Sequence, residues 1–145
     1  MQADLLLRPA RADEFEYVFA LHKEGLGGYI ESAWGWDEAG QRRDLRAGFD
    51  AGNFEVAVRG GRPVGMISLS TQADHLYLND IIVAPDRRGG GIGTALMRMV
   101  LARARERGVA LRLSVFHANP ARALYQRLGF RITAEDEHRA WMETR

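Results

Sequence analysis

Hydrophobic residues recur at helical spacing in four parts of the chain, and each recurrence predicts a helix. In the first helix, Asp13 is the expected N-cap, and the glycines at 25, 27 and 28 are expected to end it. Asp37 is the expected cap of the second helix. A third helix begins near residue 92 and ends at Gly108, and Asn119 and Gly129 bracket a short fourth one. The apolar face of the first helix comprises Phe15, Val18, Phe19, His22 and Leu26.

Alternating and continuous apolar runs predict the strands. The expected strands are residues 4–8, 54–59, 63–70, 76–83, 110–116, 130–133 and 139–142. Gly60 and Gly61 separate the second and third runs and can take the positive φ values of a two-residue hairpin turn. The run 76–83 is mostly apolar, which predicts a place at the centre of the sheet. The order β-α-α-β-β-β-α-β-α-β-β predicts an α/β (α+β) fold on one mixed sheet.

Composition narrows the classes of function. A chain of 145 residues that is 46% hydrophobic can bury one sizeable core, so we expect a single domain, 1–145. The absence of cysteine excludes disulfides, a thiolate nucleophile and a cysteine-ligated metal, and we expect no metal site. The net charge of +1 provides no overall field for binding nucleic acid. No apolar run is long enough to cross a bilayer, and no signal layout is present, so a cytoplasmic location is expected.

The stretch from Ile81 to Val100 combines a β-branched run, a proline, two arginines, a glycine-rich turn and the start of a helix. A helix start with bare N–H groups behind glycines is an anion site, which suggests a coenzyme pyrophosphate. The dinucleotide pattern fails because Thr94 or Leu96 stands where its third glycine is needed. The Walker A pattern fails because no Gly-Lys-Ser or Gly-Lys-Thr follows the turn.

Two motifs resemble one known family. The run Val83-x-Pro85-x-x-Arg88-Gly-x-Gly-Ile-Gly93 is similar to the acyl-CoA-binding motif of the GNAT superfamily of N-acyltransferases. The run 119–130, Asn-Pro-Ala-Arg-Ala-Leu-Tyr-Gln-Arg-Leu-Gly-Phe, resembles the second motif of that family. Asn119 lies six residues before Tyr125, whereas in many relatives the spacing is seven, and Ala118 occupies that place.

The resemblance implies a mostly antiparallel, twisted mixed sheet of six to seven strands flanked by four helices. It also implies a splay between the strands ending near Val83 and Phe116, where pantetheine amides pair as an added strand would. The implied coenzyme is acetyl-CoA, and Tyr125 is implied as the general acid that protonates the leaving thiolate. Arg87 is a further candidate for contact with the phosphates. The residues implied to bind the coenzyme are Ile81, Ile82, Val83, Arg88, Gly89, Gly90, Gly91, Ile92, Gly93, Thr94, Asn119 and Tyr125.

The general base is left open by the sequence. Asp80 is a candidate base or water-orienting group, and it lies on the face of its strand opposite Asn79. Some relatives place a glutamate on the fifth strand, where this chain has only Ser114, with His117 just beyond. A chain of ordered water is a further alternative. His22 is interpreted first as a hydrogen-bonded core residue and second as a base.

The acceptor is expected to be a primary amine of a small molecule or a peptide. In the family, the regions that flank the thioester correspond to residues 29–37 and the final hairpin. Two alternatives to an enzyme remain: an acyl-CoA-binding sensor or regulatory module, and a nucleic-acid binder, which the charge disfavours. A homodimer is compatible with the sequence, and no nucleic-acid or membrane partner is expected. The expected acceptor-pocket residues are Tyr29, Glu31, Trp34 and Trp36.

Overall fold

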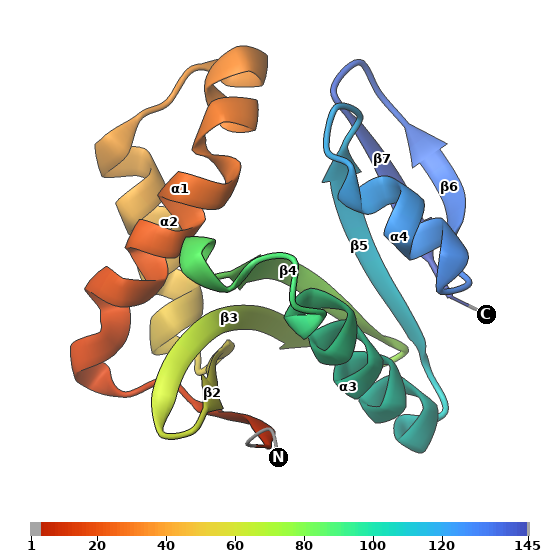
Figure 1. Ribbon diagram of the computed structural model, residues 1–145. Coiled ribbons are helices and arrows are strands. Elements are labelled where there is room, and N and C mark those ends of the chain that lie inside the picture. Colours follow the sequence, from red (N-terminus) through yellow and green to blue (C-terminus); the bar gives the residue numbers. More distant parts are fainter. Residues whose placement is uncertain (1–3, 145) are drawn as a thin grey trace. The chain divides into compact units, whose positions relative to one another are not determined.

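The computed structural model describes residues 4–144, and its elements follow the predicted order (Figure 1). The helices are α1 (Phe15–Trp34), α2 (Glu38–Asp50), α3 (Ile92–Arg107) and α4 (Ala121–Arg127), with short 3-10 helices η1 (Ala12–Glu14) and η2 (Pro85–Arg87). The strands are β1 (Leu5–Pro9), β2 (Phe54–Arg59), β3 (Arg62–Thr71), β4 (His75–Val83), β5 (Ala110–Phe116), β6 (Arg131–Glu135) and β7 (Arg139–Glu143).

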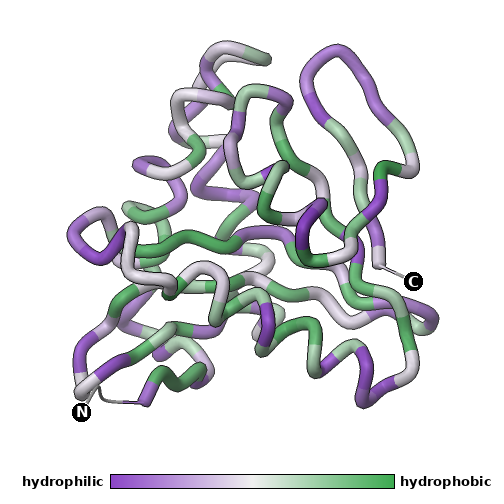
Figure 2. Tube along the Cα trace, turned by 45° about the vertical axis from the view of Figure 1, so that its right-hand side comes forward, coloured by the Kyte–Doolittle hydropathy of each residue, from purple (hydrophilic) through white to green (hydrophobic). Residues whose placement is uncertain are grey.

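The seven strands form one sheet in the order β1-β2-β3-β4-β5-β7-β6, which confirms the mixed α/β prediction and places β4 at the centre. β4 pairs with β5 in parallel, whereas β1 with β2, β2 with β3, β5 with β7 and β6 with β7 are antiparallel. The turn between β2 and β3 has positive φ at Gly60 and Gly61, as predicted for this hairpin. In Figure 2 the turn between β6 and β7 is hydrophilic, which agrees with its run of charged residues.

The described residues divide into two compact units. The first unit contains residues 4–68 and 80–96, and the second contains 69–79 and 97–144. β3, β4 and α3 each contribute residues to both units. The expected glycine loop and the end of β4 therefore belong to the first unit, whereas Asn119 and Tyr125 belong to the second.

The core of the first unit lies where α1 packs on the strands. α1 and α2 lie side by side (Figure 1), and the ring of Phe49 meets that of Phe15 edge-on at 5.4 Å. The predicted apolar face of α1 is confirmed, with His22 buried among its members. The buried cluster comprises Phe15, Val18, Phe19, Leu21, Phe54, Val56, Met66, Ile82 and Ala84.

The second unit has its own buried residues on β5, β7, α4 and the later turns of α3. β5 buries every second side chain, Leu111, Leu113 and Val115, as a strand with one covered face does. Tyr125 of α4 is buried and packs against Phe130, with ring centroids 5.8 Å apart. Gly108 ends α3 at φ +67°, as predicted.

The prediction that the glycines at 25, 27 and 28 end the first helix is wrong, because α1 continues to Trp34. Gly25 is needed for close packing inside the helix: a Cβ there would lie 2.8 Å from Cδ1 of Ile82. The helix ends instead at Gly35, whose φ of +82° breaks the helical path and whose N–H bonds to the carbonyl of Glu31. Residues 29–34 are therefore helical.

Asp13 is not the cap of the first helix, which corrects a second prediction. It lies within η1, and the adjacent Glu14 accepts the N–H of Arg11 at 2.8 Å. Glu14 also pairs with Arg8 at 2.7 Å, and this hydrogen bond lowers the pKa of Glu14 to about 2. Arg8 on β1 therefore holds the Glu14 carboxylate in place, and Glu14 rather than Asp13 accepts the free backbone N–H at the start of this helical segment.

Gly65 of β3 provides a test of the packing that supports the end of β4. A Cβ at this position would lie 2.6 Å from the carbonyl oxygen of Ile82, which is backbone and cannot move aside. We expect Gly65→Ala to lower the free energy of unfolding by about 2 kcal/mol, within the usual cost of overpacking. Gly28→Ala is the control, since its Cβ would meet nothing within 4 Å and alanine favours the helix interior by about 1 kcal/mol. Urea denaturation measures both, and equal effects would contradict the close approach of β3 and β4.

Candidate functional site

The loop between β4 and α3 contains two glycines with open space beside their backbone. Gly89 and Gly91 have φ of +84° and +82°, and a Cβ on either would meet no atom within 4 Å. The first hydrogen bond of α3 runs from the N–H of Ala95 to the carbonyl of Gly91 at 3.0 Å. The N–H groups at 92–94 precede this bond and point out of the helix start. Open space, bare amides and the positive end of a helix dipole together fit a phosphate group.

The end of β4 presents backbone groups on the side away from β3. The carbonyl of Ile82 faces β3 beside Gly65, and the N–H of Ala84 bonds to the carbonyl of Val64 at 2.9 Å. Because backbone groups alternate along a strand, the polar groups of Ile81 and Val83 point the other way. The carbonyl of Val83 accepts a hydrogen bond from Nε of Arg88 at 3.1 Å.

Arg88 is held by a carboxylate that sequence reasoning missed. Its two terminal nitrogens bind both oxygens of Glu24 on α1, with Nη1 to Oε2 at 3.0 Å. This fork lowers the pKa of Glu24 and raises that of Arg88. The structure thus places Arg88 as a brace between the glycine loop, Val83 and α1. Glu24 lies 64 residues away, so no local pattern pairs the two.

His22 and Asp80, two residues that the sequence left uncertain, form a buried pair. Nδ1 of His22 lies 2.8 Å from Oδ2 of Asp80, and the side chains are only 7% and 6% exposed. Nε2 of His22 lies 2.8 Å from Oε1 of Gln41 on α2. Burial lowers the pKa of His22, but the hydrogen bond and charge of Asp80 outweigh it, and the pKa is raised above its usual 6.5. Asn79 faces the opposite side of the strand, as predicted, and bonds to the Ser70 hydroxyl at 2.8 Å.

In the second unit, the ladder that joins β4 to β5 runs from the pair His75 and Ala110 to the pair Leu78 and Leu113. Beyond this ladder β4 continues to Val83 and β5 to Phe116.

Asn119 and Tyr125 belong to the start and middle of α4. Pro120 stands at the N-cap position of α4, one residue after the predicted Asn119, and Oδ1 of Asn119 accepts the N–H of Ala121, the first helical residue, at 2.9 Å. Tyr125 is on the buried side of the helix, packed against Phe130.

His117, which follows β5, has structural partners. One ring nitrogen, Nε2, lies 2.9 Å from the carbonyl of Asp136, and Nδ1 lies 3.0 Å from Nη1 of Arg122. Arg122 continues to Glu135 at 3.1 Å. This chain joins the start of α4 to the hairpin of β6 and β7.

The expected acceptor residues lie at and beyond the end of α1. Trp36 packs against Phe19 and His22, with ring centroids 6.2 and 6.0 Å apart, and its indole N–H donates to Glu38 at 2.8 Å. Glu31 accepts the backbone N–H of Trp36. Trp34 is 53% exposed, so of the two tryptophans only Trp36 forms part of the core edge.

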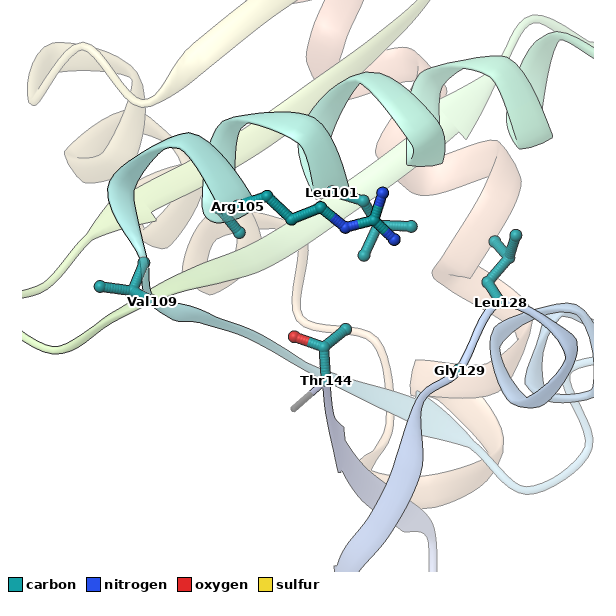
Figure 3. Close-up of a pocket in the computed structure, with 7 residues that line it drawn as sticks. Leu101, Arg105, Val109, Leu128, Gly129 and Thr144 are labelled. Atoms are coloured by element: carbon teal, nitrogen blue, oxygen red, sulfur yellow. The ribbon is translucent and has the colours of Figure 1, made fainter.

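A separate pocket of about 220 Å³ in the second unit is lined by residues outside the predicted site (Figure 3). Leu101 and Arg105 of α3, Leu128 after α4 and Thr144 after β7 border it. Its charged lining group is Arg105, which is exposed, so the pocket lacks a buried charge that would orient a ligand.

A comparison of the sequence with known protein families identifies the family of this chain. The sequence profile of the acetyltransferase (GNAT) family matches residues 11–130. The chain belongs to the GNAT acetyltransferase family. It is 44% identical over 72 residues to streptothricin acetyltransferase of Streptomyces lavendulae, a match that covers 48% of this chain and 38% of that protein. The chain thus matches less than half of the length of this curated relative.

Solved structures show the same GNAT fold. The PaiA N-acetyltransferase of Thermoplasma acidophilum, solved with coenzyme A, has a TM-score of 0.77 at 17% identity, covering 98% of this chain and 99% of that one. Nourseothricin acetyltransferase is 33% identical, with a TM-score of 0.56 over 63% of each chain. The GNAT profile and these folds agree with the element order read from the sequence.

Among residues 4–144, no three or more His, Cys, Asp or Glu side chains are grouped so as to hold a metal ion. In the same part of the chain, no helix has both the length and the apolar character to cross a membrane.

Proposed function

We propose that this GNAT protein is an N-acetyltransferase that moves the acetyl group of acetyl-CoA to a primary amine. The proposal rests on the loop backbone at Gly89 and Gly91, which we call the cradle. Both glycines have positive φ and open space beside the Cα, and the N–H groups at the start of α3, which have no helical partners, follow them. Glycine loses more backbone entropy on folding than other residues, so this run is costly unless a ligand uses it.

The residues around the cradle fit a coenzyme with a pyrophosphate and two amides. The N–H groups of residues 89–94 would receive the pyrophosphate. The outward backbone groups of Ile81 and Val83 would pair with the pantetheine amides. Bound acetyl-CoA would supply the acyl thioester. Arg88 would act mainly by bracing the loop, because its guanidinium fork is engaged by Glu24.

Tyr125 is proposed as the general acid for the leaving thiolate. A phenol with a pKa of about 10 can donate to a thiolate whose thiol has a pKa of about 8.5, taking cysteine as the model. Burial against Phe130 would fix the direction of the ring. Asn119 would act on the coenzyme indirectly, by accepting the N–H of Ala121 at the start of the helix that carries Tyr125.

The acceptor is proposed to be a primary amine on a small molecule or peptide, admitted near Tyr29, Glu31 and Trp34. The name of the Streptomyces relative, streptothricin acetyltransferase, favours a small molecule as the first acceptor to test. We further propose that both units act as one acyltransferase domain in the cytoplasm, as a monomer or homodimer, without a nucleic-acid or membrane partner.

Calorimetry with acetyl-CoA followed by a thiol-release assay tests this proposal. We expect saturable binding with a stoichiometry of one, and CoA release that depends on an added amine from a panel of streptothricin-type antibiotics, amino acids and peptides. Absence of binding would contradict the coenzyme site. Binding without turnover across the panel would favour the sensor over the enzyme.

A further inference from the structure

We propose that His22, oriented by its hydrogen bond to Asp80, is the general base that accepts a proton of the acceptor amine through water. This inference rests on the proposed acetyltransfer and adds the proton acceptor that the sequence left open. The pair belongs wholly to the first unit, where Asp80 precedes by one residue the segment 81–83 proposed to hold the pantetheine.

The geometry of the pair is that of a buried, oriented histidine and carboxylate. Asp80 comes from the central strand and His22 from the third turn of α1, with Nδ1 and Oδ2 2.8 Å apart. A carboxylate on one ring nitrogen fixes the tautomer and favours the imidazolium, so the ring becomes a stronger proton acceptor. Since Nδ1–H stays bonded to Asp80, Nε2 is the nitrogen that would accept the proton, through water.

Gln41 allows the pair to change protonation state without losing a hydrogen bond. When His22 is charged, its Nε2–H donates to Oε1 of Gln41, which is the contact that the structure records at 2.8 Å. When Nε2 is deprotonated, the amide can turn and donate its own N–H to that nitrogen. A buried polar group that stays satisfied in both states titrates at lower cost than one that is orphaned in one of them.

The charges around His22 leave Asp80 as the group that controls it. From β4 the facing charge is Asp80, and from α2 the facing group is the neutral Gln41. Lys23 and Glu38, which both contact Trp36, pair with each other at 2.9 Å. Their charges largely cancel, because the two groups are close together and exposed.

The proton balance of the step is complete. The acceptor ammonium gives one proton, through water, to neutral His22 beside Asp80, and this forms the imidazolium. The free amine then forms the N–C bond to the thioester carbonyl, and the C–S bond breaks. The nitrogen loses its second proton as the amide forms, and this proton restores, through solvent, the one that Tyr125 gives to the leaving thiolate. His22 returns the first proton to solvent.

The rate should therefore follow the neutral form of His22. Because the hydrogen bond and charge of Asp80 raise the pKa of His22 above 6.5, kcat/KM should climb with pH through an ionisation above that value. His22→Gln should lower kcat/KM about 10- to 100-fold at neutral pH, in line with the loss of general base assistance, and should remove this ionisation. The affinity for acetyl-CoA should stay within about twofold of the wild type.

His75→Gln is the matched control. His75 makes an equally short contact, 2.8 Å from Nδ1 to Oδ1 of Asp74, but that carboxylate is 78% exposed and lies at the other end of β4. We expect the control to keep the rate and the pH profile of the wild type.

Gln41→Leu tests the pair while leaving His22 and Asp80 in place. Loss of the acceptor for Nε2–H should lower the pKa of His22, because the hydrogen bond of Gln41 to the charged ring is stronger than its bond to the neutral ring. The ionisation in kcat/KM and the NMR titration of the His22 ring should move together to lower pH. A folded His22→Gln enzyme with wild-type rate and pH profile would overturn the proposal, and so would a Gln41→Leu profile that does not move. Either result would leave the acetyltransferase proposal intact, provided that amine-dependent CoA release is seen.

Discussion

Tyr125→Phe is expected to lower kcat for amine acetylation about 100-fold, the lower end of the usual contribution of a general acid. The affinity for acetyl-CoA should change by less than about twofold, because phenylalanine keeps the ring that packs against Phe130. Steady-state thiol release and calorimetry measure the two quantities. The large effect on kcat with a small effect on binding is the mark of an interaction made in the transition state.

The leaving group provides an independent check on Tyr125. An acetyl thioester with a more acidic thiol needs less protonation as the C–S bond breaks, so the variant should lose less activity with such a donor. Tyr77→Phe, on β4 before the proposed coenzyme segment, is the control and should keep wild-type kinetics with both donors. Equal losses with both donors in Tyr125→Phe would assign the residue to packing alone.

Gly91→Ala is expected to weaken acetyl-CoA binding at least about 100-fold. Alanine at φ +82° costs about 1 kcal/mol or more, and its Cβ would occupy the open space where the phosphate must approach the backbone. Loss of the amide contacts and of the helix-start geometry adds to this cost, since charge-assisted hydrogen bonds contribute about 1.5–3 kcal/mol each. Calorimetry with acetyl-CoA and with free CoA measures the effect.

Gly52→Ala separates backbone strain from loss of the cradle. Gly52 also has φ of +82° and open space around its Cα, but it lies in the turn between α2 and β2. Both variants should lose similar stability in thermal unfolding, and only Gly91→Ala should lose coenzyme affinity. If Gly91→Ala binds acetyl-CoA as the wild type does, the loop is not the phosphate site.

Local sequence determined the positions of most elements, and it did so for physical reasons that act over a few residues. The period of apolar positions predicted the four helices and seven strands, because one face of each must be buried. Gly60, Gly61 and Gly108 predicted two turns, because these turns require positive φ and glycine takes it without strain. Local signals failed at Gly25, where glycine permits contact with Ile82 and does not end α1.

The residues of the candidate site likewise divide into those that local sequence predicted and those that it did not. The glycine run and the order of strand, loop and helix predicted the open turn before α3, since glycine takes positive φ without strain, and anion binding there stays a prediction. Tyr125 was predicted through the resemblance of its motif, and its catalytic role stays a prediction. Side-chain partners from distant segments were beyond reach, because an ion pair such as Glu24 with Arg88 leaves no periodic trace in the sequence.

The sequence by itself therefore determined the fold class, the GNAT resemblance and the place of the glycine loop, because each depends on spacing within short segments. Only the tertiary structure decided which partners His22 and Asp80 have. Packing of α1 and α2 on the central strand brings a histidine, a carboxylate and Gln41 within hydrogen-bond distance across 58 and 19 residues of chain. Because these polar groups are buried, each needs a hydrogen-bond partner, and the two residues therefore form one hydrogen-bonded pair.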